Sequence, residues 1–153
     1  MKETTLCYIE RGTQYLMLHR VKKENDVNRD KWIGIGGHIE PGETPEVCIL
    51  REAREETALT LTEYRCRGII YFYNDVCASE IMHLFTATAF TGEIGSCDEG
   101  DLEWIDKSRL YDLTLWEGDR IFLRLLDENA PFFKLELFYH GEELLSHKLE
   151  YVN

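Results

Sequence analysis

Residues 37–59, GHIEPGETPEVCILREAREETAL, are the most constraining segment of the sequence, because they place six glutamates close together. Like charges at this density repel one another, so the segment needs a structural or chemical reason to hold them. Its second half carries a well-marked helix start, since Thr44 can cap the N-terminus and Pro45 suits the first helical position. We therefore predict a helix from Thr44 to about Ala58.

The predicted helix separates a carboxylate face from an apolar face. Glu52, Glu55 and Glu56 gather on one side, because residues at spacings i, i+3 and i+4 are neighbours on a helix. Arg51 and Arg54 lie near these carboxylates but not at the centre of their cluster. The opposite side is expected to face the core, and it carries Val47, Leu50, Ala53 and Thr57.

A solvated helix face is one interpretation of the three carboxylates, and a site for a hard divalent cation such as Mg²⁺ is the other. The turn GIGGHIEPGE (residues 34–43) favours the cation site, because glycine backbone can come close to a ligand. Clustered carboxylates with nearby backbone carbonyls are the kind of oxygen ligands that Mg²⁺ takes in proteins. Bound metal would relieve the repulsion among the glutamates.

The remainder of the chain contains strands and one further helix, with no repeat or linker, so we expect a single domain over residues 1–153. Strands mixed with two helices predict an α/β (α+β) layered domain with mixed strand pairing. The expected elements are a hairpin at 4–20 turning at Arg11-Gly12, an exposed loop at 21–31, strands at 32–39, 67–75, 81–92 and 100–106, a helix at 118–129, and a hairpin at 132–152 turning at Gly141.

Composition narrows the choice of partners and compartment. The formal net charge is −12 and the pI about 4.8, so we expect no polymeric nucleic acid and no anionic membrane surface as a partner. The five cysteines form no C-x-x-C pair, which favours reduced thiols in the cytoplasm over disulfides or structural zinc. The N-terminus has no apolar signal-peptide region, and no apolar run is long enough for a transmembrane helix.

The glutamate-rich segment resembles the Nudix box, G-x5-E-x7-R-E-U-x-E-E-x-G-U, where U is a bulky or aliphatic apolar residue. Ala53 is a small occupant of the first apolar position. Ala58 replaces the glycine of the pattern, and alanine is a poor but possible left-handed cap. The other matching positions are Gly37, Glu43, Arg51, Glu52, Glu55, Glu56 and Leu59.

This resemblance implies a Nudix α/β/α sandwich, with a mixed β-sheet flanked by helices, and Mg²⁺-dependent cleavage of a diphosphate, with Mn²⁺ as a possible substitute. Arg51 would pair with Glu43 and hold the loop against the helix. Glu56 or Glu99 would act as general base. The implied metal ligands are the Gly36 carbonyl and the side chains of Glu52, Glu55, Glu56 and Glu99.

Beyond the box, KWIGIGG (31–37) and SCDEGDLEWID (96–106) resemble the MutT/MutX-like branch of the family, which hydrolyses 8-oxo-dGTP and other oxidised purine nucleotides. Trp116 and Asp119 in LWEGD would stack on the base and hydrogen-bond its edge. One departure is Ile33, which stands where the animal enzymes have a base-holding asparagine. The remaining substrate-binding positions implied are Thr5, Arg20, Gly36, Gly37 and His38.

Several of these residues also have simpler interpretations. Trp32 and Trp104 are better explained as core residues than as ligand contacts. Asp119 can serve as a favourable charge at a helix N-terminus, and Glu99 can be ordinary loop charge. His38 can be a surface histidine.

The expected partner is a small-molecule nucleotide, bound by a monomer or homodimer. Within the enzyme class, ADP-ribose, a dinucleoside polyphosphate and a canonical nucleoside triphosphate are alternative substrates. A Nudix-fold sensor that binds a nucleotide without cleaving it is the alternative from another class. Such sensors usually lose glutamates from the box, whereas Glu52, Glu55 and Glu56 are all present here.

Overall fold

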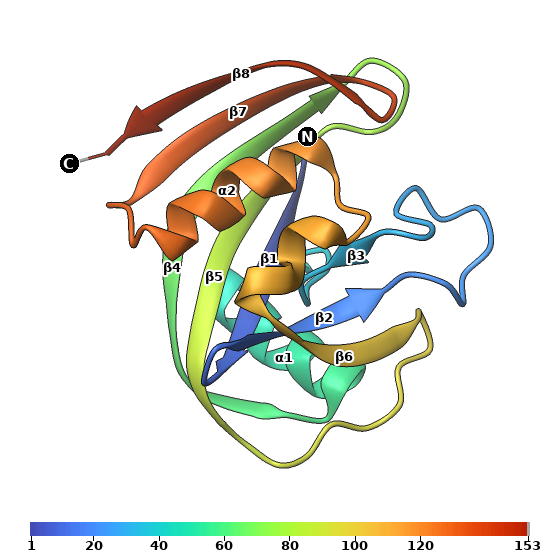
Figure 1. Cartoon of the computed structure of the whole chain (residues 1–153), viewed down its shortest axis with the longest axis vertical. Coiled ribbons are helices and arrows are strands. Elements are labelled where there is room, and N and C mark those ends of the chain that lie inside the picture. Colours follow the sequence, from blue (N-terminus) through green and yellow to red (C-terminus); the bar gives the residue numbers. More distant parts are fainter. Residues whose placement is uncertain (153) are drawn as a thin grey trace.

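The computed structural model describes residues 1–152 and consists of a mixed β-sheet with a helix on each face (Figure 1). In order across the sheet, the strands are β3-β2-β1-β5-β4-β7-β8, and β6 also pairs with β2. The β1–β5 and β4–β7 pairs are parallel and the other pairs antiparallel, which confirms the predicted fold class. The elements are β1 (Lys2–Arg11), β2 (Gln14–His19), β3 (Trp32–Ile33), α1 (Pro45–Thr57), β4 (Thr60–Asn74), β5 (Glu80–Thr91), β6 (Asp101–Asp106), the 3₁₀ helix η1 (Lys107–Asp112), α2 (Glu117–Asp127), β7 (Phe133–His140) and β8 (Glu143–Tyr151).

The sheet has an apolar core on each side. In Figure 1, α2 lies in front of the sheet and α1 behind it. Strand β1 serves both cores, because successive side chains of a strand point to opposite faces. Leu6 and Tyr8 belong to the core on the α2 side, whereas Cys7 and Ile9 belong to the core on the α1 side. Burial on both faces explains why the middle of β1 is apolar without alternation.

Helix α1 begins as predicted, since the Thr44 hydroxyl accepts a hydrogen bond from the Val47 amide at 3.1 Å and Pro45 is the first helical residue. The predicted core face is partly wrong. Val47 is 49% exposed, while Cys48 and Ile49 are fully buried beside Ala53. The helix is rotated because one of its glutamates, Glu56, turns inward to contact backbone, as described below.

Ala58 caps the C-terminus of α1 and adopts the left-handed conformation that the pattern assigns to glycine, with φ of 68°. A Cβ in this region costs about 1 kcal/mol, and the side chain is exposed, so little packing is lost without it. Ala58→Gly is therefore expected to raise Tm by about 2–4 °C in differential scanning calorimetry. Ala78→Gly is the matched control, because Ala78 is exposed and has no positive φ. An equal gain in both variants would contradict this explanation.

Two local predictions were inaccurate. Strand β4 begins at Thr60, earlier than the expected residue 67. The expected strand at 32–39 is short, ending at Ile33, after which only isolated bridges join Ile35 to Cys7 and His38 to Thr4. Glycines in this segment bring its backbone very close to β1, and a Cβ on Gly36 would lie 1.9 Å from the Thr5 carbonyl oxygen.

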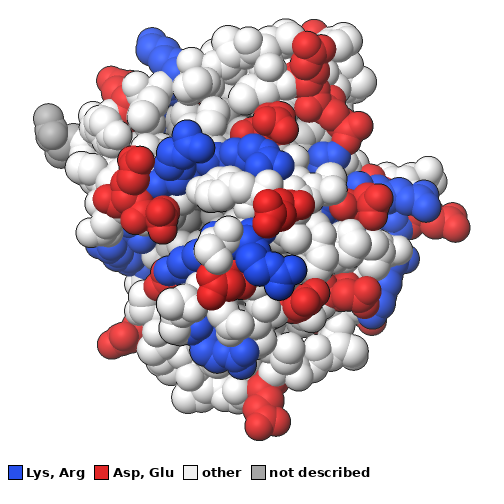
Figure 2. All heavy atoms as spheres, viewed as in Figure 1, with Lys and Arg blue, Asp and Glu red and all other residues white. Residues whose placement is uncertain are grey.

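The surface carries charges of both signs (Figure 2), and the cysteines are not paired with one another. Figure 2 shows Lys and Arg side chains interspersed with Asp and Glu on the face that it presents, rather than a continuous basic surface. The five cysteines are free thiols. Among the described residues, no helix combines the length and apolar character needed to cross a membrane.

Candidate active site

A cavity of about 640 Å³ brings together residues that lie between Thr4 and Asp119 in the sequence and that come from both sides of the sheet. Glu52 reaches it from α1 and Glu99 from the loop before β6. Ile33, Phe72 and Met82 line it from the side of the α2 core. The cavity therefore joins a carboxylate-rich region to an apolar region. Of the predicted site residues, those that line it are Thr5, Arg20, Gly36, Gly37, His38, Glu52, Glu99, Trp116 and Asp119.

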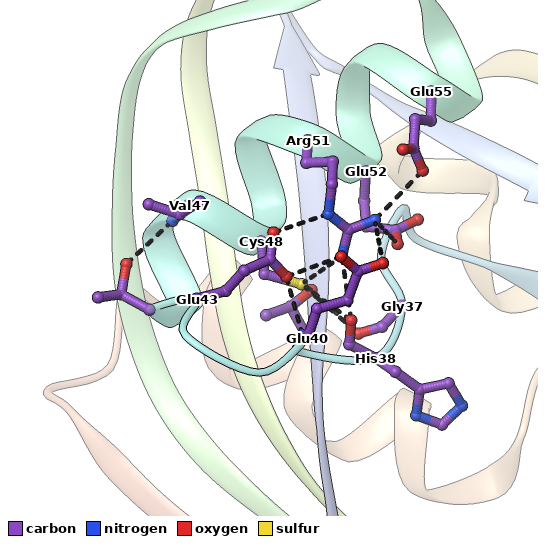
Figure 3. Close-up of polar contacts among 11 residues, drawn as sticks. Gly37, His38, Glu40, Glu43, Val47, Cys48, Arg51, Glu52 and Glu55 are labelled. Atoms are coloured by element: carbon purple, nitrogen blue, oxygen red, sulfur yellow. Dashed lines mark hydrogen bonds and ion pairs between the residues drawn. The ribbon is translucent and has the colours of Figure 1, made fainter.

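Arg51 organises the carboxylates beside this cavity (Figure 3). Its guanidinium donates two hydrogen bonds to Glu43, from Nε at 2.7 Å and from Nη2 at 2.9 Å, so the pair implied by the resemblance is present. It also donates to Glu52 at 2.7 Å and to Glu55 at 3.2 Å. The expectation that Arg51 lies away from the centre of the cluster was wrong. The hydrogen bonds from Arg51 lower the pKa of Glu43 to about 2.

Arg51 also fixes the loop before α1. It donates to the His38 carbonyl at 3.1 Å, and Figure 3 shows the His38 ring pointing away from the guanidinium. The Gly37 carbonyl accepts a hydrogen bond from the Thr5 amide at 2.9 Å, which ties the same loop to β1. The glycine-rich turn is thus held from both sides, with its backbone facing the cavity.

Gly37 lies directly against the Glu52 carboxylate, since an added Cβ would be 2.6 Å from Oε1. Gly37→Ala is expected to displace Glu52 and lower kcat/KM about 100-fold with a small change in Tm, because only the end of a flexible side chain must move. Gly36→Ala is the contrasting variant, because its Cβ would meet backbone and destabilise the fold. Full activity of Gly37→Ala would show that the position of Glu52 is unimportant.

Glu56 is the buried member of the cluster. Its Oε2 accepts a hydrogen bond from the Gly36 amide at 3.1 Å, which places the carboxylate directly behind the cavity wall. Burial, together with the nearby carboxyl groups of Glu99 and Glu52, raises the pKa of Glu56 to about 10. Three carboxyl groups this close need a proton or a cation between them, which is the situation a divalent metal would resolve.

The donor set therefore suits a hard cation, but the side chains are not gathered as a complete site. Within residues 1–152, no three His, Cys, Asp or Glu side chains are arranged to hold a metal ion. Glu55 lies outside the cavity, with its side chain 60% exposed and held by Arg51. Arg51 also binds Oε1 of Glu52, so one of the two oxygens of this carboxylate is already engaged. The predicted ligands Glu52 and Glu99 line the cavity and Glu56 bonds Gly36 at its wall, so a bound metal would have to draw Glu55 toward them.

Arg20 links the carboxylate region to the β2–β3 loop. Its Nε donates to Asp26 at 2.7 Å, and its Nη1 lies 3.6 Å from Glu99 Oε2. Asp26 in turn accepts the Asn28 amide at 3.0 Å. Arg20 is nearly buried yet lines the cavity, so its charge faces the space that an anionic ligand would fill.

Trp116 and Asp119 form the far wall at the start of α2. The Trp116 indole donates from Nε1 to Asn28 Oδ1 at 2.7 Å, and the Lys31 ammonium lies 4.7 Å from the ring centroid. Asp119 is buried against the cavity. Burial raises its pKa to about 8, while the nearby charge on Lys31 acts in the opposite direction.

Sequence reasoning missed Asn28 and Lys31. Both belong to the segment 21–31, which was expected to be only an exposed loop. Asn28 contacts Trp116 across 88 positions of sequence, and Lys31 pairs with Glu142 in the β7–β8 turn. No local pattern reports contacts of this range. The other two tryptophans, Trp32 and Trp104, are partly buried and pack against the cores, as expected.

Comparison with known proteins identifies the class. A family model described as the NUDIX domain matches residues 2–126, and the chain belongs to this family of hydrolases. Nudix hydrolases act on small nucleotide substrates and generally use a divalent metal.

Individual relatives refine this assignment. The chain is 28% identical to an uncharacterized Nudix hydrolase, YvcI, of Bacillus subtilis (strain 168), covering 98% of this chain and 95% of the relative. It is 30% identical to an oxidized purine nucleoside triphosphate hydrolase of Danio rerio, covering 85% and 84%. Among solved structures, a mutator MutT protein from Bacillus halodurans superposes with a TM-score of 0.86 at 26% identity, covering 98% of both chains.

Proposed function

We propose that this Nudix hydrolase cleaves oxidised purine nucleoside triphosphates, 8-oxo-dGTP in particular, to the monophosphate and pyrophosphate in a Mg²⁺-dependent reaction. The observation that carries the proposal is the shared cavity. It places Glu52, Glu99 and Arg20 in the same space as Trp116 and Asp119. One ligand with a phosphate chain and a flat, partly polar base would contact both groups. The similarity to the Danio rerio enzyme supports the same substrate class.

In this proposal the box residues hold the metal and the attacking water. Glu52, Glu55, Glu56 and Glu99 would be the metal ligands, with the Gly36 carbonyl. When bound, Mg²⁺ neutralises charge on phosphate oxygens and lowers the pKa of water, and Mn²⁺ is the expected substitute.

The protein supplies positioning and proton transfer. Glu56 or Glu99 takes a proton from the attacking water at a carboxylate oxygen. Arg51 does not contact substrate and acts by fixing Glu43 and Glu52 relative to the glycine turn. Arg20 and the backbone around Gly37 and His38 line the space for the phosphates.

The base end selects the nucleotide. Trp116 offers an aromatic surface, and Asp119 offers a carboxyl group in a desolvated setting where an unpaired hydrogen-bonding atom is costly. A pKa of about 8 makes Asp119 largely protonated at neutral pH, so that it both donates and accepts. Ile33 lines the same cavity and makes no hydrogen bond to a base.

The proposal is tested by initial rates with 8-oxo-dGTP and dGTP, with Mg²⁺ and with excess chelator, while separating monophosphate, pyrophosphate and phosphate products. We expect Mg²⁺-dependent release of pyrophosphate and a kcat/KM for 8-oxo-dGTP at least about 10-fold above that for dGTP. Release of phosphate alone, or no preference between the bases, would contradict it. Binding without turnover of any nucleotide would instead indicate a sensor.

The biological setting follows from the substrate. A cytoplasmic monomer or homodimer with this activity would remove damaged nucleotides before their incorporation into DNA, which is a form of nucleotide-pool sanitation linked to DNA repair. Residues 1–153 would act as one Nudix domain in this role.

A further inference from the structure

The cavity wall near Trp116 carries a side-chain amide, although Ile33 stands where the animal enzymes have a base-holding asparagine. Asn28, in the β2–β3 loop, lines the cavity and is the only asparagine or glutamine among the described residues that do so. This observation extends the proposed function and rests on it, because it concerns how the purine is recognised.

The orientation of the Asn28 side chain is fixed by its partner. The Trp116 indole N–H can only donate, so the atom it meets at 2.7 Å must be the Asn28 oxygen, and Nδ2 must point elsewhere. Because an indole N–H points outward in the ring plane, Asn28 lies at the edge of the Trp116 ring. A base stacked on that ring would therefore bring its own edge toward the amide.

The donor on Asn28 is also free. Within residues 1–152, Nδ2 donates to no protein acceptor, whereas the Asn28 backbone amide bonds Asp26 and its carbonyl accepts from Lys31. Asp26 is itself held by Arg20 at 2.7 Å, so the loop presents the amide from an anchored position. A positioned donor of this kind is what selects a ligand acceptor at low entropic cost.

The neighbouring cation does not duplicate this donor. The Lys31 ammonium lies over the face of Trp116 and pairs with Glu142 in the β7–β8 turn. Asp119 offers a carboxyl group from α2. Asn28 therefore offers a neutral amide donor from the β2–β3 loop, on a different element from the Asp119 carboxyl group, and a neutral donor matches a carbonyl oxygen on a base.

We propose that Asn28 is a specificity-determining residue, whose Nδ2 donates a hydrogen bond to a carbonyl oxygen of the purine and replaces the amide absent at Ile33. The carbonyl is O6, present in dGTP and 8-oxo-dGTP, or O8, present in 8-oxo-dGTP and 8-oxo-dATP. Both belong to the same chemistry, and a panel of these nucleotides with dATP separates them.

The decisive variant is Asn28→Asp, because it keeps an oxygen for the Trp116 indole and replaces the donor with a carboxylate oxygen. Placing a carboxylate against a carbonyl oxygen leaves both acceptors unpaired. We expect kcat/KM to fall about 100-fold for nucleotides that carry the recognised carbonyl and less than about 3-fold for the others. Equal losses on dGTP and 8-oxo-dGTP assign O6, and losses confined to the two 8-oxo nucleotides assign O8.

Two further variants separate recognition from positioning. Asn25→Asp makes the same change of charge in the same loop at an exposed residue outside the cavity, and it should leave the panel unchanged. Asn28→Leu removes both the acceptor and the donor. If Asn28 acted only by holding Trp116, Asn28→Asp would retain wild-type rates. Asn28→Leu would then lower kcat/KM equally for all four nucleotides.

The outcomes distinguish this inference from the proposed function. A wild-type protein that hydrolyses none of the four purine triphosphates overturns the proposed function and this inference together. A wild-type protein that hydrolyses them, with a uniform effect or no effect in Asn28→Asp, overturns the role of Asn28 alone. A carbonyl-dependent loss in Asn28→Asp supports it.

Discussion

Glu56→Gln is expected to lower kcat on the order of 10³-fold while leaving the fold intact. The substitution keeps the shape of the side chain but removes a carboxylate that is buried beside Glu52 and Glu99 and that bonds the Gly36 amide. Stability should not fall, because burial and the carboxyl groups of Glu99 and Glu52 raise the pKa of Glu56 to about 10. The side chain is therefore held neutral in the folded protein without metal, and glutamine is neutral at every pH. Steady-state rates and the Tm in chelator measure the two effects separately.

The effect of Mg²⁺ on the Tm provides a readout that is independent of turnover. Mg²⁺ binding to the folded state should raise the Tm of the wild-type protein and raise that of Glu56→Gln much less. Glu46→Gln is the control, since Glu46 lies in the first turn of the same helix and is exposed. Wild-type turnover and an unchanged Mg²⁺ response in Glu56→Gln would remove Glu56 from the metal site.

Asp119→Ala is the second substitution with a large expected effect. It should lower kcat/KM for 8-oxo-dGTP about 100-fold or more and reduce the preference over dGTP about 10-fold. The reason is burial, since a base that has left water must recover its hydrogen bonds from the pocket. Glu117→Gln is the control at the same end of α2, because Glu117 is exposed. An unchanged ratio of specificity constants would show that Asp119 does not read the base.

Asp119 should also leave a signature in stability as a function of pH. Its folded-state pKa of about 8 lies above the ordinary value of 3.8, so the folded protein holds a proton that the unfolded chain has lost. Its contribution to stability is therefore fully present below about pH 4 and declines as the pH rises to about 8. Asp119→Asn does not titrate, so its Tm advantage over wild type should grow across this window and level off above it.

The glutamate helix was the part of the fold most predictable from sequence. Thr44, Pro45 and Ala58 act locally, so cap and termination could be read from neighbours in the chain. The core face could not be read as well, because Glu56 turns inward to a backbone amide 20 residues away. That contact depends on the folded glycine turn, and a helical wheel assigns Glu56 to the solvent side.

The candidate site was likewise predictable from the sequence only in part. Arg51 and Glu43 are eight positions apart and belong to one motif, so their pair was foreseeable. The wall formed by Trp116 and Asn28 joins segments 88 positions apart, and only the sheet topology brings them together. Ile33 is a departure that the sequence itself shows, whereas the position of the Asn28 amide beside Trp116 depends on the fold.

The most direct test of the central claim is a competition experiment. An equimolar mixture of 8-oxo-dGTP, dGTP, the other nucleoside triphosphates, ADP-ribose and a diadenosine polyphosphate is incubated with the protein and Mg²⁺, and each compound is followed by chromatography. Relative rates of disappearance give the ratios of kcat/KM directly. We expect 8-oxo-dGTP to disappear first, with its monophosphate and pyrophosphate as products. Earlier loss of ADP-ribose or a dinucleoside polyphosphate would contradict the proposed substrate while leaving the Nudix chemistry in place.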